Sequence, residues 1–487
     1  MILRNGRVDL MEEERAANEV KRIAIIGGGI SGLTAAYTLV KEAERARVRC
    51  DITLYESRDT LGGSIRTIKK EGSIMDLGPE CFVTTKPALL ELFEELGIQE
   101  RLIQQKKRTV YISRDSVLES LPEGIFSFSP SKMGSLVQSK VLSWPGKLRT
   151  AFEVFVPPNH RKDESVAEFV TRRFGAECLE RLVEPFVGGV YGNHPESLSA
   201  RSTLPFLIAL EETHGSVIRG LVRSQHKVKR GGAKATQSPM ATFDQGMFVL
   251  VEELRNFLDS KCVIENKEVI SIESGTHGHK WDVHWAYGFN SVDAVIVATP
   301  APNAATILEH IDRPLANQLR WIKHSSPIIV SLLYERKSVR HSLDGSGFVI
   351  PRRERKSIRA CTFSSSKFSG RTPEGKVLLR LSLNTLTMPE LERLSDQAIE
   401  DIVTRDLSEY LSILREPNSI TITRHHNAIP QLSPGHQLLV QEIESRISNY
   451  PDIVLTGNCY SGMGISDCVA RAKSGAIRLA LVLNQCA

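Results

Sequence analysis

The chain of 487 residues contains no stretch of about 18 uncharged apolar residues, so no membrane-spanning helix is expected. Its charges nearly balance: 62 Lys and Arg against 57 Asp and Glu leave a net +5, which does not suit a dedicated nucleic-acid binder. The eight cysteines form no Cys-x-x-Cys pair, and the 13 histidines lack metal-ligand spacing. The sequence therefore predicts neither a metal site nor a nucleic-acid partner.

The remaining composition is that of a globular protein, 41% hydrophobic and 24% charged. The length suits two or three domains. Residues 1–20 are too charged for a signal peptide and are expected to form a flexible leader. Scattered cysteines are typical of a reducing compartment, so a cytoplasmic location is expected.

The first organised unit has the pattern of a dinucleotide-binding fold. Residues 23–26 form an apolar run, a G-x-G-x-x-G motif occupies residues 27–32, and apolar residues then recur at helical spacing. A second apolar run, residues 52–55, ends at Glu56, where a carboxylate can accept hydrogen bonds from ribose hydroxyls. This order predicts a strand, turn, helix and strand that bind a pyrophosphate at the helix N-terminus. The alternative is a glycine-rich packing turn with a surface glutamate.

Further segments resemble the FAD-binding amine-oxidase-like flavoproteins. Residues 57–67 carry a second glycine pair, residues 76–82 read D-L-G-P-E-C-F, and residues 295–300 and 456–467 resemble the returning strand and the final cofactor turn. The resemblance implies FAD as the cofactor. It assigns cofactor binding to Gly27, Gly28, Gly29, Ile30, Ser31, Gly32, Glu56, Ser57, Gly63, Ser64, Gly78, Pro79, Glu80, Cys81, Val269, Gly457, Met463, Gly464 and Ile465.

Residues 184–199 sharpen the resemblance. They read E-P-F-V-G-G-V-Y-G-N-H-P-E-S-L-S and resemble the signature of the protoporphyrinogen and coproporphyrinogen III oxidases. The chain is similar to the bacterial branch of that family found in Gram-positive organisms, whose members often use coproporphyrinogen III. It departs from the usual pattern at Asn193-His194, Ser64 and His425.

The resemblance implies an α/β fold with α+β inserts, in which three parts are built from interrupted segments. A Rossmann-like FAD-binding domain is expected from residues 21–88, 228–305 and 425–487. A helical domain is expected over residues 89–203, with contact to a membrane surface left open. A mixed-sheet substrate domain is expected from residues 204–227 and 306–424.

The activity implied is the six-electron oxidation of a porphyrinogen to the porphyrin in heme biosynthesis. The flavin takes hydride and molecular oxygen takes the electrons, with release of hydrogen peroxide, so no catalytic side chain is named. Protoporphyrinogen IX and coproporphyrinogen III both remain open as the substrate. A homodimer and a peripheral position on the inner face of the cell membrane also remain open.

The family's substrate slot maps to Gly189, Val349, Thr362 and Leu381. For Val349 and Leu381 an ordinary place in a strand core is an equal alternative. Lys86 is the candidate partner for a substrate carboxylate, against the alternative of a solvated surface lysine. Arginine would match a carboxylate better, but the sequence singles none out.

Two other functions remain open on the same fold. One is an amine oxidase or a carotenoid desaturase, because a fold alone does not define the substrate. The other is a carrier of flavin or porphyrin that performs no chemistry. The 184–199 signature argues against the first, and turnover with oxygen separates the oxidase from the carrier.

Overall fold

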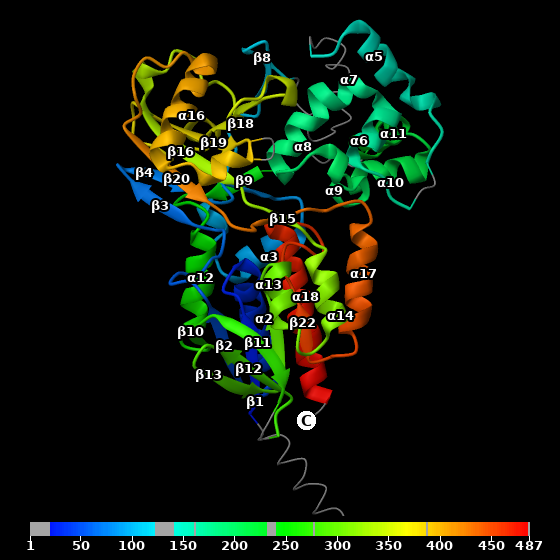
Figure 1. Cartoon of the computed structure of the whole chain (residues 1–487), viewed down its shortest axis with the longest axis vertical. Coiled ribbons are helices and arrows are strands. Elements are labelled where there is room, and N and C mark those ends of the chain that lie inside the picture. The colour runs from blue at the N-terminus through cyan, green and yellow to red at the C-terminus, as the bar shows by residue number, and fades with distance from the viewer. Residues whose placement is uncertain are drawn as a thin grey trace, which may run out of the picture.

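The computed structural model describes residues 20–121, 141–159, 162–230, 240–275, 278–385 and 388–485. The expected leader, residues 1–20, lies outside the described residues apart from residue 20. Figure 1 shows three parts: a layered α/β unit in the lower half, a sheet with helix α16 at upper left, and a group of helices at upper right. The predicted α/β fold with inserted parts is confirmed.

A parallel sheet of five strands organises the lower unit. Its order is β10-β2-β1-β14-β22, so strands from three distant parts of the chain lie side by side. β1 pairs with β2 through Ile23↔Ile52 and with β14 through Ile23↔Ala294. These strands are short apolar runs, as expected where both faces are covered. Their bounds are β1 (Lys21–Ile26), β2 (Cys50–Glu56), β10 (Val263–Asn266), β14 (Ala294–Val297) and β22 (Ile453–Leu455).

Layers of different kinds cover the two faces of this sheet. On one face, α2 (Ile30–Ala46) packs with α3 (Pro87–Glu95), α12 (Val249–Leu258) and α18 (Ile465–Gln485) in one apolar core. On the other face, α13 (Ala301–Ile307), α14 (Arg313–Arg320) and α17 (His436–Ile447) pack in a second core. An antiparallel sheet belongs to this second core; its strands are β11 (Val269–Ser274), β12 (Trp281–Trp285) and β13 (Gly288–Val292).

A sheet of seven strands forms the upper-left part. Its order is β20-β16-β19-β18-β17-β7-β8, antiparallel except where β17 meets β7. Helix α16 (Asp396–Leu411) covers one face in a separate core. The strands are β7 (Val110–Arg114), β8 (Val117–Ser120), β16 (Ile328–Glu335), β17 (Gly347–Val349), β18 (Ile358–Phe363), β19 (Lys376–Leu383) and β20 (Ser419–Arg424).

The upper-right part is helical and has a core of its own. Ser165 opens helix α6 with a capping box: its side chain accepts from the Glu168 N–H, and Glu168 accepts from the Ser165 N–H. The helices are α5 (Trp144–Ala151), α6 (Val166–Phe174), α7 (Ala176–Cys178), α8 (Glu184–Tyr191), α9 (Ala200–Thr203), α10 (Pro205–His214) and α11 (Val217–Arg230).

Smaller elements join the three parts. β3 (Thr67–Lys70) and β4 (Ser73–Asp76) form a hairpin, and β15 (His324–Ser325) pairs with β21 (Ile429–Pro430). β9 (Met240–Phe243) lies between β5 (Phe82–Val83) and β6 (Leu102–Gln104). The short helices are α15 (Ser364–Lys367), η1 (Gln99–Arg101), η3 (Phe152–Phe155), η4 (Leu179–Val183), η5 (Pro195–Ser197), η6 (Arg336–Ser338), η7 (Arg352–Glu354) and η8 (Pro389–Arg393).

Three stretches lie in a different part from the one the sequence predicts. β7 and β8, expected in the helical domain, extend the seven-stranded sheet, because β7 pairs with β17. α10 and α11, expected with the substrate domain, bury Leu207 and Leu221 in the helical core. α13 crosses the expected domain boundary at residue 305, and α14 lies in the segment expected in the substrate domain. Both helices pack on the five-stranded sheet.

Helix α8 contains three residues that are typical helix breakers. Pro185 and the pair Gly188-Gly189 favour a break in the helix, yet all three lie within α8. Pro185 is in the first turn of α8, directly after a π-helical turn, η4, and such a turn is where an interruption of the regular helical hydrogen bonds is accommodated.

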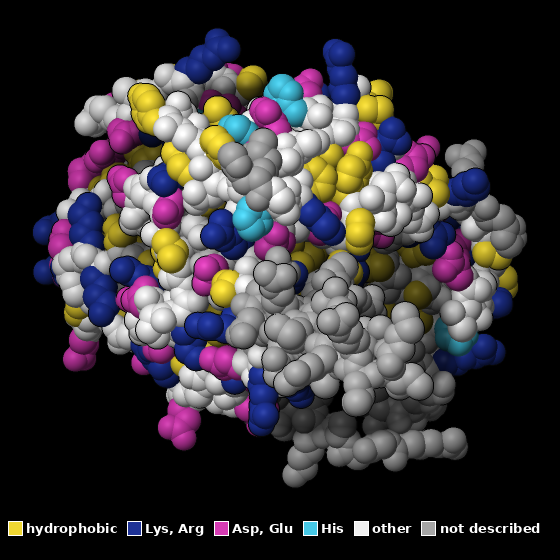
Figure 2. Space-filling view, turned by 90° about the horizontal axis from the view of Figure 1, so that it is seen from below, with side chains coloured by type: hydrophobic (Ala, Val, Ile, Leu, Met, Phe, Trp, Pro, Cys, Tyr) yellow, Lys and Arg dark blue, Asp and Glu magenta, His cyan; other side chains and the backbone are white. Residues whose placement is uncertain are grey.

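Charges of both signs are interspersed on the end of the molecule opposite the two upper parts, seen from below in Figure 2. Single hydrophobic side chains lie between them on the described part of that face. Within the described residues, no helix is both long and apolar enough to cross a membrane.

Candidate functional site

The turn between β1 and α2 lets the protein backbone come close to a ligand. Gly27 has φ +104°, a conformation that favours glycine. A Cβ on Gly32 would lie 1.8 Å from the Gly27 carbonyl oxygen, so helix and turn can pack only with glycine there. Gly29 caps α2 in an extended conformation without a side-chain hydrogen bond, and the helix has no acidic residue in its first turn. Ile30 and Ser31 begin the helix, so an anion would meet its positive dipole end.

Glu56 is held over this turn at the end of β2. The buried carboxylate accepts the Gly28 N–H at 2.8 Å, the Arg58 N–H at 3.0 Å and the Ser57 hydroxyl at 3.4 Å. The second glycine pair lies directly against the first motif: the Gly62 N–H donates to the Gly28 carbonyl at 2.8 Å. A Cβ on Gly63 would lie 3.2 Å from Gly29 Cα. Two motifs more than 30 residues apart therefore form one surface.

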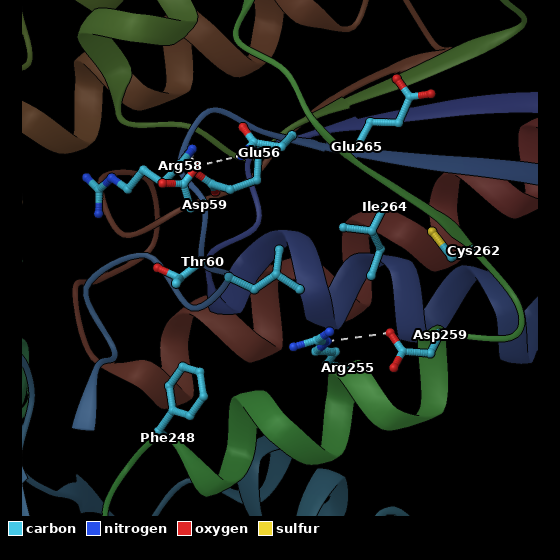
Figure 3. Close-up of a pocket in the computed structure, with 12 residues that line it drawn as sticks. Glu56, Arg58, Asp59, Thr60, Phe248, Arg255, Asp259, Cys262, Ile264 and Glu265 are labelled. Atoms are coloured by element: carbon cyan, nitrogen blue, oxygen red, sulfur yellow. Dashed lines mark hydrogen bonds and ion pairs between the residues drawn. The ribbon is translucent and has the colours of Figure 1, made fainter. Parts of the chain in front are cut away.

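A cavity of about 460 Å³ opens beside Glu56. Figure 3 shows Glu56 and Arg58 on one side of it and Phe248 with the Arg255–Asp259 ion pair on the other. Apolar side chains and charged groups both line it, which fits a planar base attached to a ribose. The lining residues are Glu56, Arg58, Asp59, Thr60, Leu61, Phe248, Arg255, Asp259, Cys262, Ile264, Glu265 and Asn266.

Val269 is not among the residues that line this cavity. Its side chain is 7% exposed and belongs to the core on the other face of the five-stranded sheet. Its assignment to cofactor binding therefore rests on the backbone of β11.

The loop after β4 is the second place where glycine is obligatory. A Cβ on Gly78 would lie 1.7 Å from the Ser64 carbonyl oxygen, so this loop lies against the second glycine motif. Arg380 Nη2 donates to the Gly78 carbonyl at 2.5 Å, and His425 Nε2 donates to the Leu77 carbonyl at 2.8 Å. The seven-stranded sheet thus fixes the loop that contains Gly78 and Pro79.

A buried ion pair anchors the next two residues of the loop. Lys367 Nζ lies 3.2 Å from Glu80 Oε2 and 3.4 Å from Cys81 Sγ, and the Ser364 hydroxyl donates to Glu80. Burial alone would raise the pKa of Glu80, but Lys367 and Arg380 outweigh it and lower the pKa to about 2. Lys367 and Arg380 are functional residues that the sequence patterns did not predict. A charged residue within an apolar strand, such as Arg380 in β19, was the sequence feature that could have indicated a buried ionic contact.

The final turn brings a second helix N-terminus to the same edge. β1 and β22 are parallel and each leads into a helix, so α2 and α18 both start at the carboxyl edge of the sheet. Gly457 has φ +145°, and Met463 and Gly464 directly precede α18, which begins at Ile465.

Lys86 lies at this edge and is paired with a carboxylate of the chain. Its Nζ forms an ion pair with Asp467, in the first turn of α18. Ser466 donates to the Val83 carbonyl at 3.3 Å, which ties the same two segments together. The Lys86 side chain is 51% exposed.

The structure brings three of the four expected slot residues to one side of the seven-stranded sheet. Thr362 pairs with Gly347, two residues before Val349 on β17, so both side chains share a face. Val349 packs with the helical core, and a Cβ on Gly189 of α8 would lie 4.0 Å from Ala360 Cβ. Helix α8 therefore covers this face.

Leu381 is not on that face, and its assignment to the slot is wrong. Side chains alternate along β19, and Leu381 packs with Phe348 and Phe363 in the core beneath α16, with no exposed surface. Arg380, one residue earlier, takes the position opposite Thr362. The core alternative weighed for Leu381 is the one the structure supports.

Among the described residues, no group of three or more His, Cys, Asp or Glu could hold a metal ion. The described cysteines are all unpaired thiols. The chemistry available at the site therefore depends on what binds at the glycine turns, Glu56 and the cavity, and these features fit an adenine dinucleotide.

Comparison with known proteins identifies the class. The model of the flavin containing amine oxidoreductases matches residues 30–480, and the chain belongs to that family. It is an oxidoreductase, and its cofactor is FAD.

Two relatives and one solved structure narrow the comparison. The coproporphyrinogen III oxidase of Bacillus subtilis is 32% identical over 93% of this chain and 97% of its own length. Protoporphyrinogen oxidase 2 of Arabidopsis thaliana is 27% identical over 96% of this chain and 95% of its own length. A crystal structure of a candidate protoporphyrinogen oxidase from Exiguobacterium sp. 255-15 superposes with a TM-score of 0.81 at 26% identity, covering 95% of this chain and 99% of that one. The predicted family is confirmed.

Proposed function

We propose that this protein oxidises a porphyrinogen to the porphyrin, with coproporphyrinogen III as its preferred substrate and molecular oxygen as the electron acceptor. The observation that carries the proposal is the similarity to the B. subtilis coproporphyrinogen III oxidase over nearly the full length of both chains. The contact between the two glycine motifs supports a cofactor site, and the face of the seven-stranded sheet that α8 covers supports a substrate slot.

The residues proposed to bind the cofactor contact different parts of FAD. Gly27 to Gly32 and Gly63 receive the pyrophosphate, and Glu56 receives the ribose at the mouth of the cavity. The segment from Gly78 to Cys81 and the turn before Ile465 hold the flavin end. FAD bound by these residues would supply the hydride acceptor for the substrate, with oxygen as the proposed final electron acceptor.

The substrate is a flexible apolar macrocycle with carboxylate arms. Gly189, Val349 and Thr362 bind its ring at the edge of the contact between α8 and the sheet, where apolar side chains exclude water. Lys86 serves as a carboxylate partner only by exchanging Asp467 for the substrate.

Aerobic turnover tests the proposal. Purified protein is mixed with coproporphyrinogen III or protoporphyrinogen IX, and porphyrin fluorescence and hydrogen peroxide are recorded together. Faster porphyrin formation from coproporphyrinogen III, with peroxide in the ratio of a six-electron oxidation, is expected. FAD-loaded protein that forms no porphyrin from either substrate contradicts the proposal and favours the carrier.

Peripheral contact with the inner face of the cell membrane is part of the proposal. Four side chains, Trp144, Leu148, Phe152 and Phe155, follow one another along α5 and η3 at roughly one-turn spacing, with exposed fractions of 58% to 74%. Lys147 Nζ lies 4.7 Å from the Trp144 ring centroid, so a cation accompanies the apolar stripe. An apolar stripe with a cation suits an anionic lipid surface.

Co-sedimentation with phosphatidylglycerol vesicles tests this contact. The double variant W144S/F155S is expected to lose binding, whereas W321S, which changes a tryptophan 74% exposed at the end of α14, is expected to retain it. Equal binding of both variants contradicts the contact. A homodimer remains a further part of the proposal, tested by light scattering of the FAD-loaded protein.

A further inference from the structure

The C-terminal end of α8 meets β18 at the edge of the proposed slot. Gly189 lies against Ala360, as described above, and the preceding residue of each element is also in contact. Arg359 Nη1 donates to the Gly188 carbonyl at 2.7 Å. Arg359 is therefore the charged side chain immediately beside the position that the resemblance assigns to the substrate ring.

Two guanidinium groups, those of Arg355 and Arg359, are buried here, and one buried carboxylate, Glu184, pairs with the first of them. The side chain of Arg355 is 1% exposed and donates to both oxygens of Glu184, at 2.9 and 3.0 Å. Arg359 is 3% exposed and has no carboxylate within ion-pair distance in the described part of the chain. A buried charge without a counterion is strongly unfavourable, so an anion at this place would be bound well.

Unused donors and electrostatics point to the same missing partner. Arg359 Nε, Arg355 Nη1 and His194 Nδ1 are buried polar atoms without a hydrogen-bond partner among the described residues. Burial, followed by the charge of Arg355, lowers the pKa of Arg359 to about 10, although the charge of Glu184 acts in the opposite direction. Burial and the charge of Arg352 lower the pKa of His194; the charge of Glu196 raises it, and those of Arg355 and Arg359 lower it further. The group has an excess of positive charge that an anion would neutralise.

Capping of α8 does not account for a charged side chain at this position. The Gly188 carbonyl already accepts the Gly192 N–H at 3.0 Å, which completes the end of the helix. A neutral donor would supply the second hydrogen bond without the desolvation that a guanidinium requires. The planar fork of a guanidinium instead matches a carboxylate.

We propose that Arg359, supported by Arg355, binds a carboxylate arm of the porphyrinogen and so contributes to the choice between substrates with four and two carboxylates. This inference rests on the proposed function. The apolar ring then lies along Val349, Ala360 and Thr362, and the arm projects past Gly189 to the guanidinium.

Binding of the product, in the FAD-loaded protein, separates a charge effect from a packing effect. Coproporphyrin III and its tetramethyl ester are titrated while porphyrin fluorescence is followed, because the ester keeps the ring and removes the charges. The wild type is expected to bind the acid more tightly than the ester. R359Q keeps an N–H donor for the Gly188 carbonyl and is expected to weaken acid binding by about ten-fold or more, with ester binding unchanged. R405Q, which changes an exposed arginine on α16, is the matched control and is expected to behave as the wild type.

The outcomes distinguish this proposal from the proposed function. If the wild type turns over porphyrinogen but folded R359Q binds the acid as tightly as the wild type, the role of Arg359 is overturned and the proposed function stands. Wild-type protein that neither binds nor oxidises any porphyrinogen overturns the function and this inference together. If R359Q does not fold, R359K replaces it: it keeps the charge without the fork, a smaller loss confined to the acid is expected, and an unchanged acid affinity overturns the proposal.

Discussion

Alanine at two glycines of the same motif should have opposite consequences for folding and for FAD binding. A Cβ on Gly32 would lie 1.8 Å from the Gly27 carbonyl oxygen, far inside van der Waals contact. Gly29 has φ −73°, which any residue adopts, and a Cβ there would meet only Gly63 Cα, at 3.9 Å, among atoms within 4 Å. G32A therefore disturbs the polypeptide itself, whereas G29A occupies space that the account assigns to the pyrophosphate.

The magnitudes follow from these contacts. G32A forces α2 away from β1 and is expected to destabilise the protein lacking FAD by about 3 kcal/mol or more, the upper part of the range for overpacking. G29A is expected to leave the stability of that form within about 0.5 kcal/mol, as for substitutions that break no contact. Loss of a charge-assisted hydrogen bond to the phosphate weakens FAD binding by about 1.5–3 kcal/mol, which corresponds to about 10- to 150-fold in Kd.

Urea unfolding of FAD-free protein and titration with FAD measure the two effects separately. G97A is the control: Gly97 has φ +70° and no atom within 4 Å of a Cβ, so strain of about 1–2 kcal/mol and an unchanged Kd for FAD are expected. A wild-type Kd for FAD in G29A would show that the turn does not receive the pyrophosphate.

Three further variants test other parts of the site. E80Q leaves Lys367 as a buried uncompensated charge and should lower the free energy of unfolding by about 3–5 kcal/mol, measured in urea. Because the folded pKa of Glu80 is about 2, below its ordinary 4.5, the carboxylate stabilises the wild type fully above pH 4.5 and less as the pH falls toward 2. A wild-type midpoint that does not move over that interval would contradict the charged state of Glu80. L381A should lose about 2–5 kcal/mol of stability by leaving a cavity beneath α16, with KM unchanged; a raised KM in stable protein would return Leu381 to the slot. K86M should change stability by no more than about 1 kcal/mol, because its ion pair is half exposed, and a raised KM for coproporphyrinogen III would support a role in substrate binding.

The cofactor unit was predictable because its signals are local. An apolar run, a glycine turn and an amphipathic helix in sequence already define the start of the fold, and Gly27, Gly32 and Glu56 lie as their chemistry requires. The parallel pairing of β14 with β1 and with β22 joins the same kind of short apolar run from the middle and from both end regions of the chain.

The slot was less predictable because its geometry depends on register and on contacts between distant segments. Side chains alternate along β19, so that Leu381 packs in the core while its neighbour Arg380 contacts the loop that contains Gly78. Arg359 donates a hydrogen bond to Gly188 of α8, which lies 171 residues earlier in the chain. The predicted domain boundaries were wrong for a similar reason. β7 is a short strand, and its pairing with β17 is what places it in the seven-stranded sheet.

Anaerobic mixing of the FAD-loaded protein with coproporphyrinogen III tests whether this site oxidises porphyrinogens. The flavin absorbance is expected to bleach on mixing, and its return together with porphyrin fluorescence is expected when oxygen is admitted. A flavin that keeps its oxidised spectrum with both coproporphyrinogen III and protoporphyrinogen IX would contradict the claim that this site oxidises porphyrinogens.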